Sequence, residues 1–200
     1  MFRKTLMLAF GLSLAAAGAF AADTYTFGGM DAAHTDVGFN IKHWMINKVH
    51  GNFDKFDGKI VYDEKNVEKS KVEVTLDVTS IDTRNSMRDG HLRKPDFFDT
   101  EKFPTGTFKS SKVEKSSDGK SLLVTGDLTL RGVTKSVVLA TTITGKMDDN
   151  MGNTRLGFEA STKINRMDFG IAWNKTNKMG TSMLGDEVEI VISGEAKLSK

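Results

Sequence analysis

Four histidines are the side chains of this sequence with the widest chemistry, because imidazole can bind a transition metal or act as a general base near neutral pH. They are His34, His43, His50 and His91. Their spacing gives no HExxH pair and no two ligands at alternate positions of one strand, and the chain has no cysteine to complete a zinc set. The pattern favours polar positions at a rim, so we expect no metal site.

Three other patterns imitate functional motifs at the wrong spacing. Gly180–Gly185 resembles a nucleophile elbow, but the spacing differs and no strand-to-helix turn of an α/β sheet surrounds it. Asp148 and Glu159 imitate a calcium loop whose glycine, Gly152, comes one position early. The methionines near both segments are typical of gap filling rather than of copper binding. We expect no catalytic residues here, and a hairpin turn over 148–152.

A second polar set consists of Arg88, Asp89, His91 and Arg93. An arginine here can pair with Asp89 or Asp96, or it can bind the anionic head of an amphipathic ligand through a charge-assisted bidentate contact. Charges at helix ends are usually solvated or paired locally, which makes the internal pairing the commoner arrangement. Both interpretations stay open at this point.

The segment that holds this polar set is also rich in aromatic side chains. Between Arg88 and Ser110 lie four of the thirteen phenylalanines and both prolines. Ser86 and Asp89 resemble a capping box, and residues 87–93 show no period of two. This pattern predicts a short helix that Pro95 ends.

Four phenylalanines follow this helix: Phe97, Phe98, Phe103 and Phe108. Pro104 interrupts the segment, and we expect a strand to resume at Thr107 or Phe108. Each buried ring is worth about 1.5 to 3 kcal/mol, too much to leave in water. The rings must therefore either plug one end of the core or form the wall of an apolar pocket.

Most of the remaining chain alternates between apolar and polar residues, which is the pattern of half-buried strands. We predict strands over residues 37–41, 72–78, 122–130, 137–143, 156–164 and 188–192. Turn-forming residues separate these runs at 57–58, 116–119, 131–132, 148–152 and 185–186. Many short antiparallel strands without long helical stretches leave two architectures, a β-barrel or a β-sandwich.

Small residues lie beside large ones at the inward-facing positions. Gly126 is close to Leu128, and Ala160 is close to Phe158. In an eight-stranded barrel such gaps can make room for one small ligand, or they can fit the taper of a fully packed interior. The alternation alone does not choose between these two.

The first 21 residues have the order of a secretory signal peptide: Arg3 and Lys4, an apolar run over 6–17, and Ala19-Phe20-Ala21. We predict cleavage after Ala21 and a single exported domain over residues 22–200. No later apolar stretch reaches the ~18 residues of a membrane helix.

Charge and cysteine content narrow the possibilities further. The first 21 residues hold two of the 28 basic residues, which leaves 26 basic against 26 acidic ones and no net charge. This balance gives no support for nucleic-acid binding. The absence of cysteine means that the domain must be stabilised by its core rather than by disulfides.

Four blocks of the sequence resemble the YceI-like family of exported lipid-binding proteins, in the family's order and spacing. They are DAAHTDVGFNIKHWMINKVHGNFDKFDGKIVYD, VTSIDTRNSMRDGHLRKPDFFDTEKFPTGTFKS, GDLTLRGVTKSVVL and GFEASTKINRMDFGI. The resemblance runs through nearly the whole chain beyond residue 21. Gly106 departs from the family pattern, which usually has a bulkier residue there.

The resemblance implies an all-β fold, an elongated eight-stranded antiparallel lipocalin-like barrel with short helical elements. It also implies a bacterial periplasmic protein, often a homodimer, whose tunnel holds a polyisoprenoid, an isoprenoid quinone or a fatty-acid derivative. The expected ligand-binding residues are Phe39, Ile41, Trp44, Phe53, Phe56, Arg88, His91, Phe97, Phe98, Phe103, Phe108, Leu128, Phe158 and Phe169.

We therefore expect a protein that binds, sequesters or transports a long-chain amphipathic lipid, without turnover and without a required cofactor. Two alternatives remain. One is an enzyme acting on a lipid-like substrate, which needs a base and an activated group in one cleft. The other is a fully packed envelope-stress protein that acts through its outer surface.

Overall fold

Residues 22–199, which the computed structural model describes, form strands with a few short helical turns between them. In chain order the elements are β1 (Asp23–Gly28), η1 (Gly29–His34), β2 (Thr35–His43), β3 (Asn47–Phe53), β4 (Phe56–Tyr62), η2 (Val67–Lys69), β5 (Lys71–Asp77), η3 (Val78–Ser80), β6 (Ile81–Asp82), α1 (Ser86–Leu92), β7 (Thr105–Lys115), β8 (Leu122–Leu130), β9 (Val133–Asp148), β10 (Thr154–Asn165), η4 (Arg166–Phe169) and β11 (Leu184–Leu198). The predicted signal peptide, residues 1–21, lies outside the described residues.

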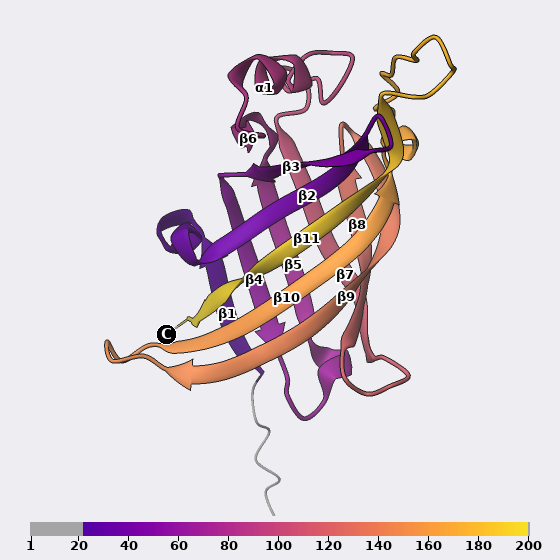
Figure 1. The fold of residues 1–200 in the computed structure, drawn as a ribbon. Helices are drawn as coiled ribbons and strands as arrows, with labels where there is room; N and C mark the ends of the chain where they lie inside the picture. The colour runs from indigo at the N-terminus through magenta and orange to yellow at the C-terminus, as the bar shows by residue number, and fades with distance from the viewer. Residues whose placement is uncertain (1–21, 200) are drawn as a thin grey trace, which may run out of the picture.

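Eight of these strands close into a ring (Figure 1). The order is β1–β4–β5–β7–β8–β9–β10–β11, and β11 returns to β1 where Tyr25 lies opposite Leu198. Every neighbouring pair is antiparallel. The predicted eight-stranded antiparallel barrel is confirmed, and the β-sandwich alternative is wrong.

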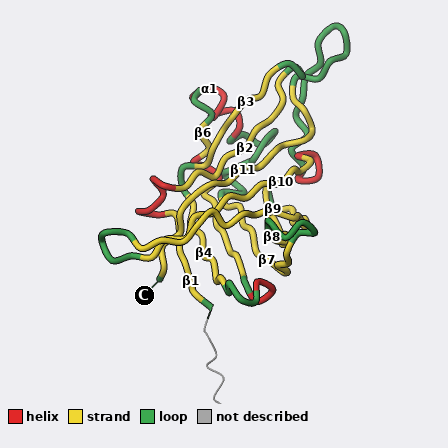
Figure 2. The backbone as a smooth tube through the Cα atoms, turned by 60° about the horizontal axis from the view of Figure 1, so that its bottom comes forward, coloured by secondary structure: helices red, strands yellow, loops and turns green. Residues whose placement is uncertain are grey.

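Three further strands extend one end of the ring. β11 pairs with β1 only through its last residues, whereas Leu184–Gly194 pairs with β2. β3 then pairs with β2, and β6 pairs with β3. The wall therefore continues beyond the ring at the end where α1 lies. We call this end the mouth end, and the opposite end, with the β9–β10 hairpin, the closed end (Figures 1 and 2).

Aromatic side chains fill the closed end. Phe27 packs against Phe56 and Phe158, with ring centroids 6.2 and 5.1 Å apart. Tyr25 and Leu156 are fully buried beside them. Because packed rings leave little room at this end, most of the empty space inside the barrel lies toward the mouth end.

The strongly alternating strands were predicted correctly, but other strands were missed. β1, β3, β4 and β6 were not predicted. The turn expected at Asp57–Gly58 is wrong, because both residues lie inside β4 and pair with β1 and β5. Gly58 marks a close approach rather than a turn: the ring of Phe27 occupies the space where a Cβ would lie. Likewise, Gly185 belongs to β11, beside its irregular register, and not to a turn between strands.

The predicted short helix is confirmed as α1, but its capping was assigned to the wrong residue. Asn85, not Ser86, is the N-cap, and its side chain accepts a hydrogen bond from the backbone N–H of Arg88 at 3.1 Å. Asp89 instead accepts hydrogen bonds from the backbone N–H and the hydroxyl of Thr83, at 2.9 and 2.5 Å. These bonds attach the helix to the end of β6.

The predicted turn between β9 and β10 is also confirmed. The carboxylate of Asp149 accepts hydrogen bonds from the backbone N–H groups of Met151 and Asn153 and from the side chain of Arg155. These contacts are internal to the hairpin and explain the acidic residues better than a calcium loop does. No helix among residues 22–199 has the length and hydropathy needed to cross a membrane.

Candidate functional site

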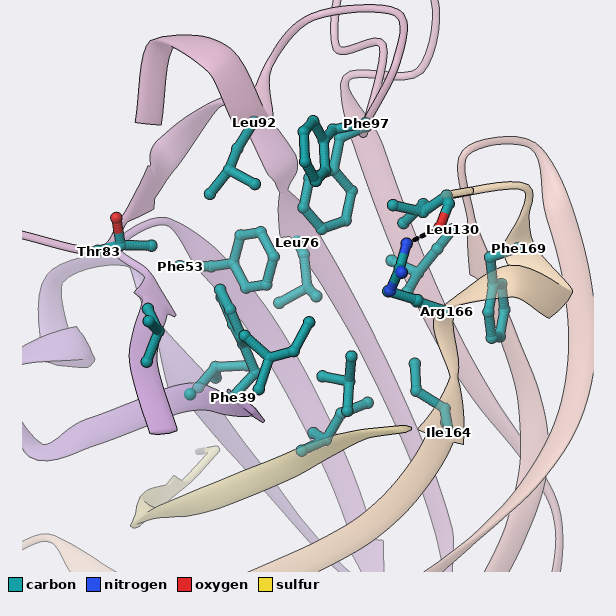
Figure 3. Close-up of a pocket in the computed structure, with 18 of the residues that line it drawn as sticks. Phe39, Phe53, Leu76, Thr83, Leu92, Phe97, Leu130, Ile164, Arg166 and Phe169 are labelled. Carbon is teal, nitrogen blue, oxygen red and sulfur yellow. Dashed lines mark hydrogen bonds between the residues drawn. The ribbon is translucent and has the colours of Figure 1, made fainter. Parts of the chain in front are cut away.

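A cavity of about 420 Å³ occupies the mouth end of the barrel (Figure 3). Its wall is almost entirely hydrocarbon, contributed by the strands of the ring, by β2 and β3, and by α1 and the segment after it. Met87, which is 84% exposed on α1, belongs to this wall, so the cavity reaches solvent beside the helix. An apolar, largely roofed space of this size is typical of a binding site for a small apolar ligand.

Three phenylalanines from separate segments line one side of the cavity. The ring centroids of Phe39 in β2 and Phe53 in β3 are 5.9 Å apart. Those of Phe53 and Phe98, which follows α1, are 6.0 Å apart. Phe39, Phe53 and Leu76 point into the same space in Figure 3. Gly51 has no side chain, which leaves space for the ring of Phe39. The strands thus position these rings as a continuous apolar surface.

Residues 93–104 complete the roof beside α1. The backbone of this segment folds onto the helix, since the N–H of Phe98 donates to the carbonyl of Leu92 at 3.0 Å and that of Thr100 to the carbonyl of Arg93 at 3.0 Å. The Val78 N–H donates to the Pro104 carbonyl at 2.8 Å and returns the segment to the barrel. Hydrogen bonds at both ends therefore keep the roof in place.

An aromatic cluster joins the roof to the loop before β11. The ring centroid of His91 is 4.9 Å from that of Phe97 and 5.3 Å from that of Trp173, and the centroids of Phe97 and Trp173 are 5.1 Å apart. The Nε2 of His91 lies 2.8 Å from a carboxylate oxygen of Asp96. The α1 region and the loop before β11, which are distant in sequence, thus meet over the cavity.

Arg131 holds the same region from the opposite side. Its Nη2 donates to the carbonyl of Pro95 at 2.7 Å, and its Nη1 donates to the carbonyl of Gly170 at 2.8 Å. Arg131 lies in the predicted turn between β8 and β9, where it and Gly132 have positive φ angles. The turn therefore fixes the roof segment and the end of η4 to the barrel rim.

Two arginines are the polar groups of greatest interest in the wall. Arg88 is half-buried and donates from Nε and Nη2 to the hydroxyl and carbonyl of Thr83, both at 2.6 Å. It pairs with neither Asp89 nor Asp96, so the internal ion pair considered from the sequence does not form within residues 22–199. A cationic group without a carboxylate partner remains at the cavity wall.

Arg166 is almost fully buried, with 3% exposure. Its guanidinium donates to the carbonyls of Gly185, Ile171 and Trp173 and to the carboxylate of Asp186. Burial lowers the pKa of Arg166, while the charge of Asp186 opposes this shift. Because these bonds use four of its five N–H donors, Arg166 mainly orders the backbone before β11.

A second cavity of about 60 Å³ lies deeper in the barrel and is lined by Phe27, Ile60, Val113 and Phe158 among others. Val37, Val74, Leu139 and Ile192 line both cavities. These four side chains form the boundary between a spacious mouth half and a nearly filled inner half.

The structure brings most of the expected ligand-binding residues together. The wall of the larger cavity includes Phe39, Ile41, Phe53, Arg88, His91, Phe97, Phe98, Phe108, Leu128 and Phe169. Phe158 lines the smaller cavity.

Three of the expected residues lie outside both walls. Phe56 packs against Phe27 at the closed end, and the ring of Phe103 covers Gly132 on the β8–β9 turn. Trp44 lies at the tip of the β2–β3 hairpin. Of the four phenylalanines that follow α1, Phe97, Phe98 and Phe108 line the larger cavity and Phe103 does not.

Sequence reasoning missed Arg166 and Trp173. Arg166 continues the inward alternation of Leu156, Phe158 and Ala160, so an arginine at that parity was the available signal. Trp173 follows in a loop without periodicity and gave none. Among the described residues, no group of three or more His, Asp or Glu side chains comes together as a possible metal site.

Comparison with known proteins agrees with this architecture. The YceI-like domain model matches residues 29–196. The protein YceI of Escherichia coli O157:H7 is 40% identical over 200 residues, covering 100% of both chains.

Two solved structures share the fold. The Campylobacter jejuni YCEI protein superposes with a TM-score of 0.68 at 37% identity, covering 86% of this chain and 98% of that one. A polyisoprenoid binding domain from Saccharophagus degradans has a TM-score of 0.61 at 12% identity, covering 89% and 99%, a likeness of fold alone. The family model and the full-length identity place the chain in the YceI-like family.

Proposed function

We propose that this protein binds a long-chain amphipathic lipid, such as a polyisoprenoid, an isoprenoid quinone or a fatty-acid derivative, as a carrier or sequestering protein of the bacterial periplasm. The tail occupies the apolar cavity, and the head lies at the wall position of Arg88 and His91. No turnover is involved. The observation that carries the proposal is the apolar cavity of about 420 Å³ beneath α1.

The energetics of such a complex are favourable. Burying ~10 methylene groups at ~0.8 kcal/mol each gives ~8 kcal/mol before association costs. Those costs are ~4 kcal/mol or more, so a preformed cavity and a long tail are both needed for useful affinity. The roof is held by backbone hydrogen bonds at both ends, which keeps the cavity formed before the ligand arrives.

The hydroxyl beside Arg88 has a structural use, which supports binding rather than turnover. Thr83 donates its hydroxyl hydrogen to Asp89 and accepts from Arg88. His91 lies against Asp96, and no hydroxyl hydrogen bond to His91 occurs within the described residues. A nucleophile activated by a histidine is therefore missing from this part of the cavity wall.

The test is to purify the protein from its own host and measure bound lipid by native mass spectrometry and solvent extraction. Leu128→Trp places an indole in the cavity, whereas Leu128→Met keeps the volume nearly unchanged. We expect stoichiometric lipid in the wild type and in Leu128→Met, and little in Leu128→Trp at an equal melting temperature. Lipid-free wild-type protein, or equal lipid in the folded Leu128→Trp variant, would refute the proposal.

A further inference from the structure

Exposed aliphatic side chains lie on two neighbouring turns at the mouth end. Ile46 is 88% exposed and Met45 is 51% exposed on the β2–β3 turn, and Met179 is 86% exposed on the loop before β11. We call residues 42–48 and 174–183 together the mouth tip. Apolar side chains gathered at one exposed site commonly mark a surface that contacts a partner or a membrane.

The two parts of the mouth tip are joined directly. The backbone N–H of Trp44 donates to the carbonyl of Met183 at 2.7 Å, and His43 lies opposite Leu184 in the β2–β11 pairing. His43, Met183 and Leu184 also line the cavity. The base of the mouth tip is therefore part of the cavity wall, while its outer end extends into solvent beside it (Figure 1).

The β2–β3 turn places apolar residues at positions where the backbone is strained. Trp44 and Met45 both have left-handed φ angles, 49° and 60°. A turn whose two central residues are both left-handed favours Asn and Gly, which adopt such angles with less strain. Met45, which is both left-handed and exposed, is more readily explained by a contact than by stability.

The charges of the mouth tip have one sign. Residues 42–53 and 169–185 contain four lysines and no Asp or Glu. Lys48 pairs with Glu189 at 3.0 Å, but within residues 22–199 no carboxylate forms an ion pair with Lys42, Lys175 or Lys178. A cationic surface around exposed aliphatic side chains is complementary to an anionic lipid bilayer.

We propose that the mouth tip docks the protein onto an anionic lipid bilayer. Ile46 and Met179 enter the headgroup region while the unpaired lysines contact anionic headgroups. This inference rests on the proposed function, because it identifies the bilayer as the surface that donates or accepts the lipid. Docking brings the mouth end to the leaflet, where a lipid tail can move into the cavity with little exposure to water.

Vesicle binding of the full protein tests the docking. Each lysine near an anionic surface changes partitioning about fivefold, so three predict a preference on the order of 100-fold for vesicles with about one-third phosphatidylglycerol over pure phosphatidylcholine. We expect the preference to disappear at about 1 M salt. Wild-type protein that ignores the anionic vesicles would overturn the proposal.

Two variants separate the contributions of the mouth tip. Ile46→Ser with Met179→Ser should weaken binding to anionic vesicles about tenfold or more, since two apolar contacts are lost. Replacing the three unpaired lysines, Lys42, Lys175 and Lys178, by Gln should remove the preference for anionic lipid. Either variant binding vesicles like the wild type would contradict the assignment.

The β9–β10 hairpin provides the matched control. Met147 and Met151 are 65% and 77% exposed at the closed end, but Asp148 and Asp149 lie between them. Met147→Ser with Met151→Ser should leave vesicle binding unchanged. If this control lost vesicle binding as strongly as the mouth-tip variant, any exposed methionine would suffice for binding. That result would overturn the role of the mouth tip.

The assay also distinguishes failure of docking from failure of lipid binding. Variants of the mouth tip should still bind lipid dispersed in detergent, and Leu128→Trp should still bind vesicles. Docking without uptake by the wild type would refute the proposed function and leave docking intact. A different result would be a wild-type dimer that forms without vesicles and that the Ile46 and Met179 substitutions dissociate. That result would assign the mouth tip to contact with a second copy of the chain and would overturn docking.

Discussion

Arg88 donates two 2.6 Å hydrogen bonds to Thr83, one to its hydroxyl and one to its carbonyl. These bonds orient the guanidinium at the cavity wall without neutralising it, since Asp89 accepts from Thr83 and Asp96 lies against His91. A fixed cation beside an apolar cavity is suited to an amphipathic ligand with an anionic head. In the proposed lipid complex, the Arg88–Thr83 contact holds the cation at the place where the head of the ligand is expected.

The first prediction concerns Arg88→Gln. Loss of a charge-assisted hydrogen bond worth about 1.5 to 3 kcal/mol should weaken binding of a fatty acid about 10- to 100-fold. A fatty alcohol of equal tail length should lose little, because its head carries no charge. Titration with both ligands checks this difference.

Arg84→Gln is the control for Arg88. Arg84 is an exposed arginine of the same segment and is not part of the cavity wall. It should change neither affinity. An equal loss for acid and alcohol in Arg88→Gln would mean that Arg88 supports the wall structurally and does not contact the head.

The second prediction concerns the roof. Trp173 contacts both His91 and Phe97, and each aromatic contact is worth about 0.5 to 1.5 kcal/mol. Trp173→Ala should therefore release bound lipid about 5- to 100-fold faster, as stopped-flow displacement would measure. Phe103→Leu, in the same roof segment but outside the cavity wall, should lose stability without a comparable gain in release rate. Similar release rates for Trp173→Ala and the wild type would exclude a gating role for the cluster.

Strands with strong alternation were predictable because burial on one face imposes a period of two. β5 and β10 follow this rule. β3 does not: its sequence NKVHGNF has few apolar residues, and its place depends on pairing with β2 and β6. The turn predicted at Gly58 was wrong for a related reason. The glycine is there because the ring of Phe27 packs against its backbone, and local sequence does not reveal this tertiary contact.

The site could be predicted only where its residues carry a local signal. The rings of the roof segment were recognisable as a group, but which of them face the cavity depends on how the segment folds onto α1. Phe103 covers the β8–β9 turn, whereas Phe97 meets Trp173. Trp173 is positioned by a hydrogen bond from Arg166 to its carbonyl, a tertiary contact that spacing does not reveal.

The third prediction is an acid-side loss of stability from the β9–β10 hairpin. Hydrogen bonds from Asn153, with others from Met151 and Arg155, hold the pKa of Asp149 well below its ordinary value. A lowered folded-state pKa contributes stability above the unfolded value of about 3.9, and that contribution is lost as pH falls below it.

Urea unfolding at about pH 7 and about pH 3 checks this dependence. At the higher pH, Asp149→Asn should be less stable than the wild type. The difference should shrink at the lower pH, because the carboxylate in the unfolded wild-type chain is protonated there before the carboxylate in the folded protein. Asp127→Asn, an exposed change on β8, should show no such convergence. A difference for Asp149→Asn that stays constant with pH would contradict the assignment.

The size of the larger cavity sets an expected tail length. An apolar cavity of about 150 Å³ holds one benzene ring, so about three such volumes correspond to roughly 15 to 20 carbons. The larger cavity measures about 420 Å³, and the smaller one beyond the boundary adds only about 60 Å³. Longer tails must either widen the boundary or remain partly outside the mouth end.

The fourth prediction follows from this boundary. Affinity for saturated fatty acids should rise up to about fourfold per methylene and level off near 15 to 20 carbons. Leu139 lines both cavities, so Leu139→Ala should join them and move the plateau to longer tails. Leu130→Ala enlarges only the mouth half of the barrel and should not move the plateau. Both substitutions should lower the free energy of unfolding by about 2 to 5 kcal/mol, the usual cost of removing a buried leucine side chain. A plateau that stays at one length in both variants would show that the boundary does not limit the tail.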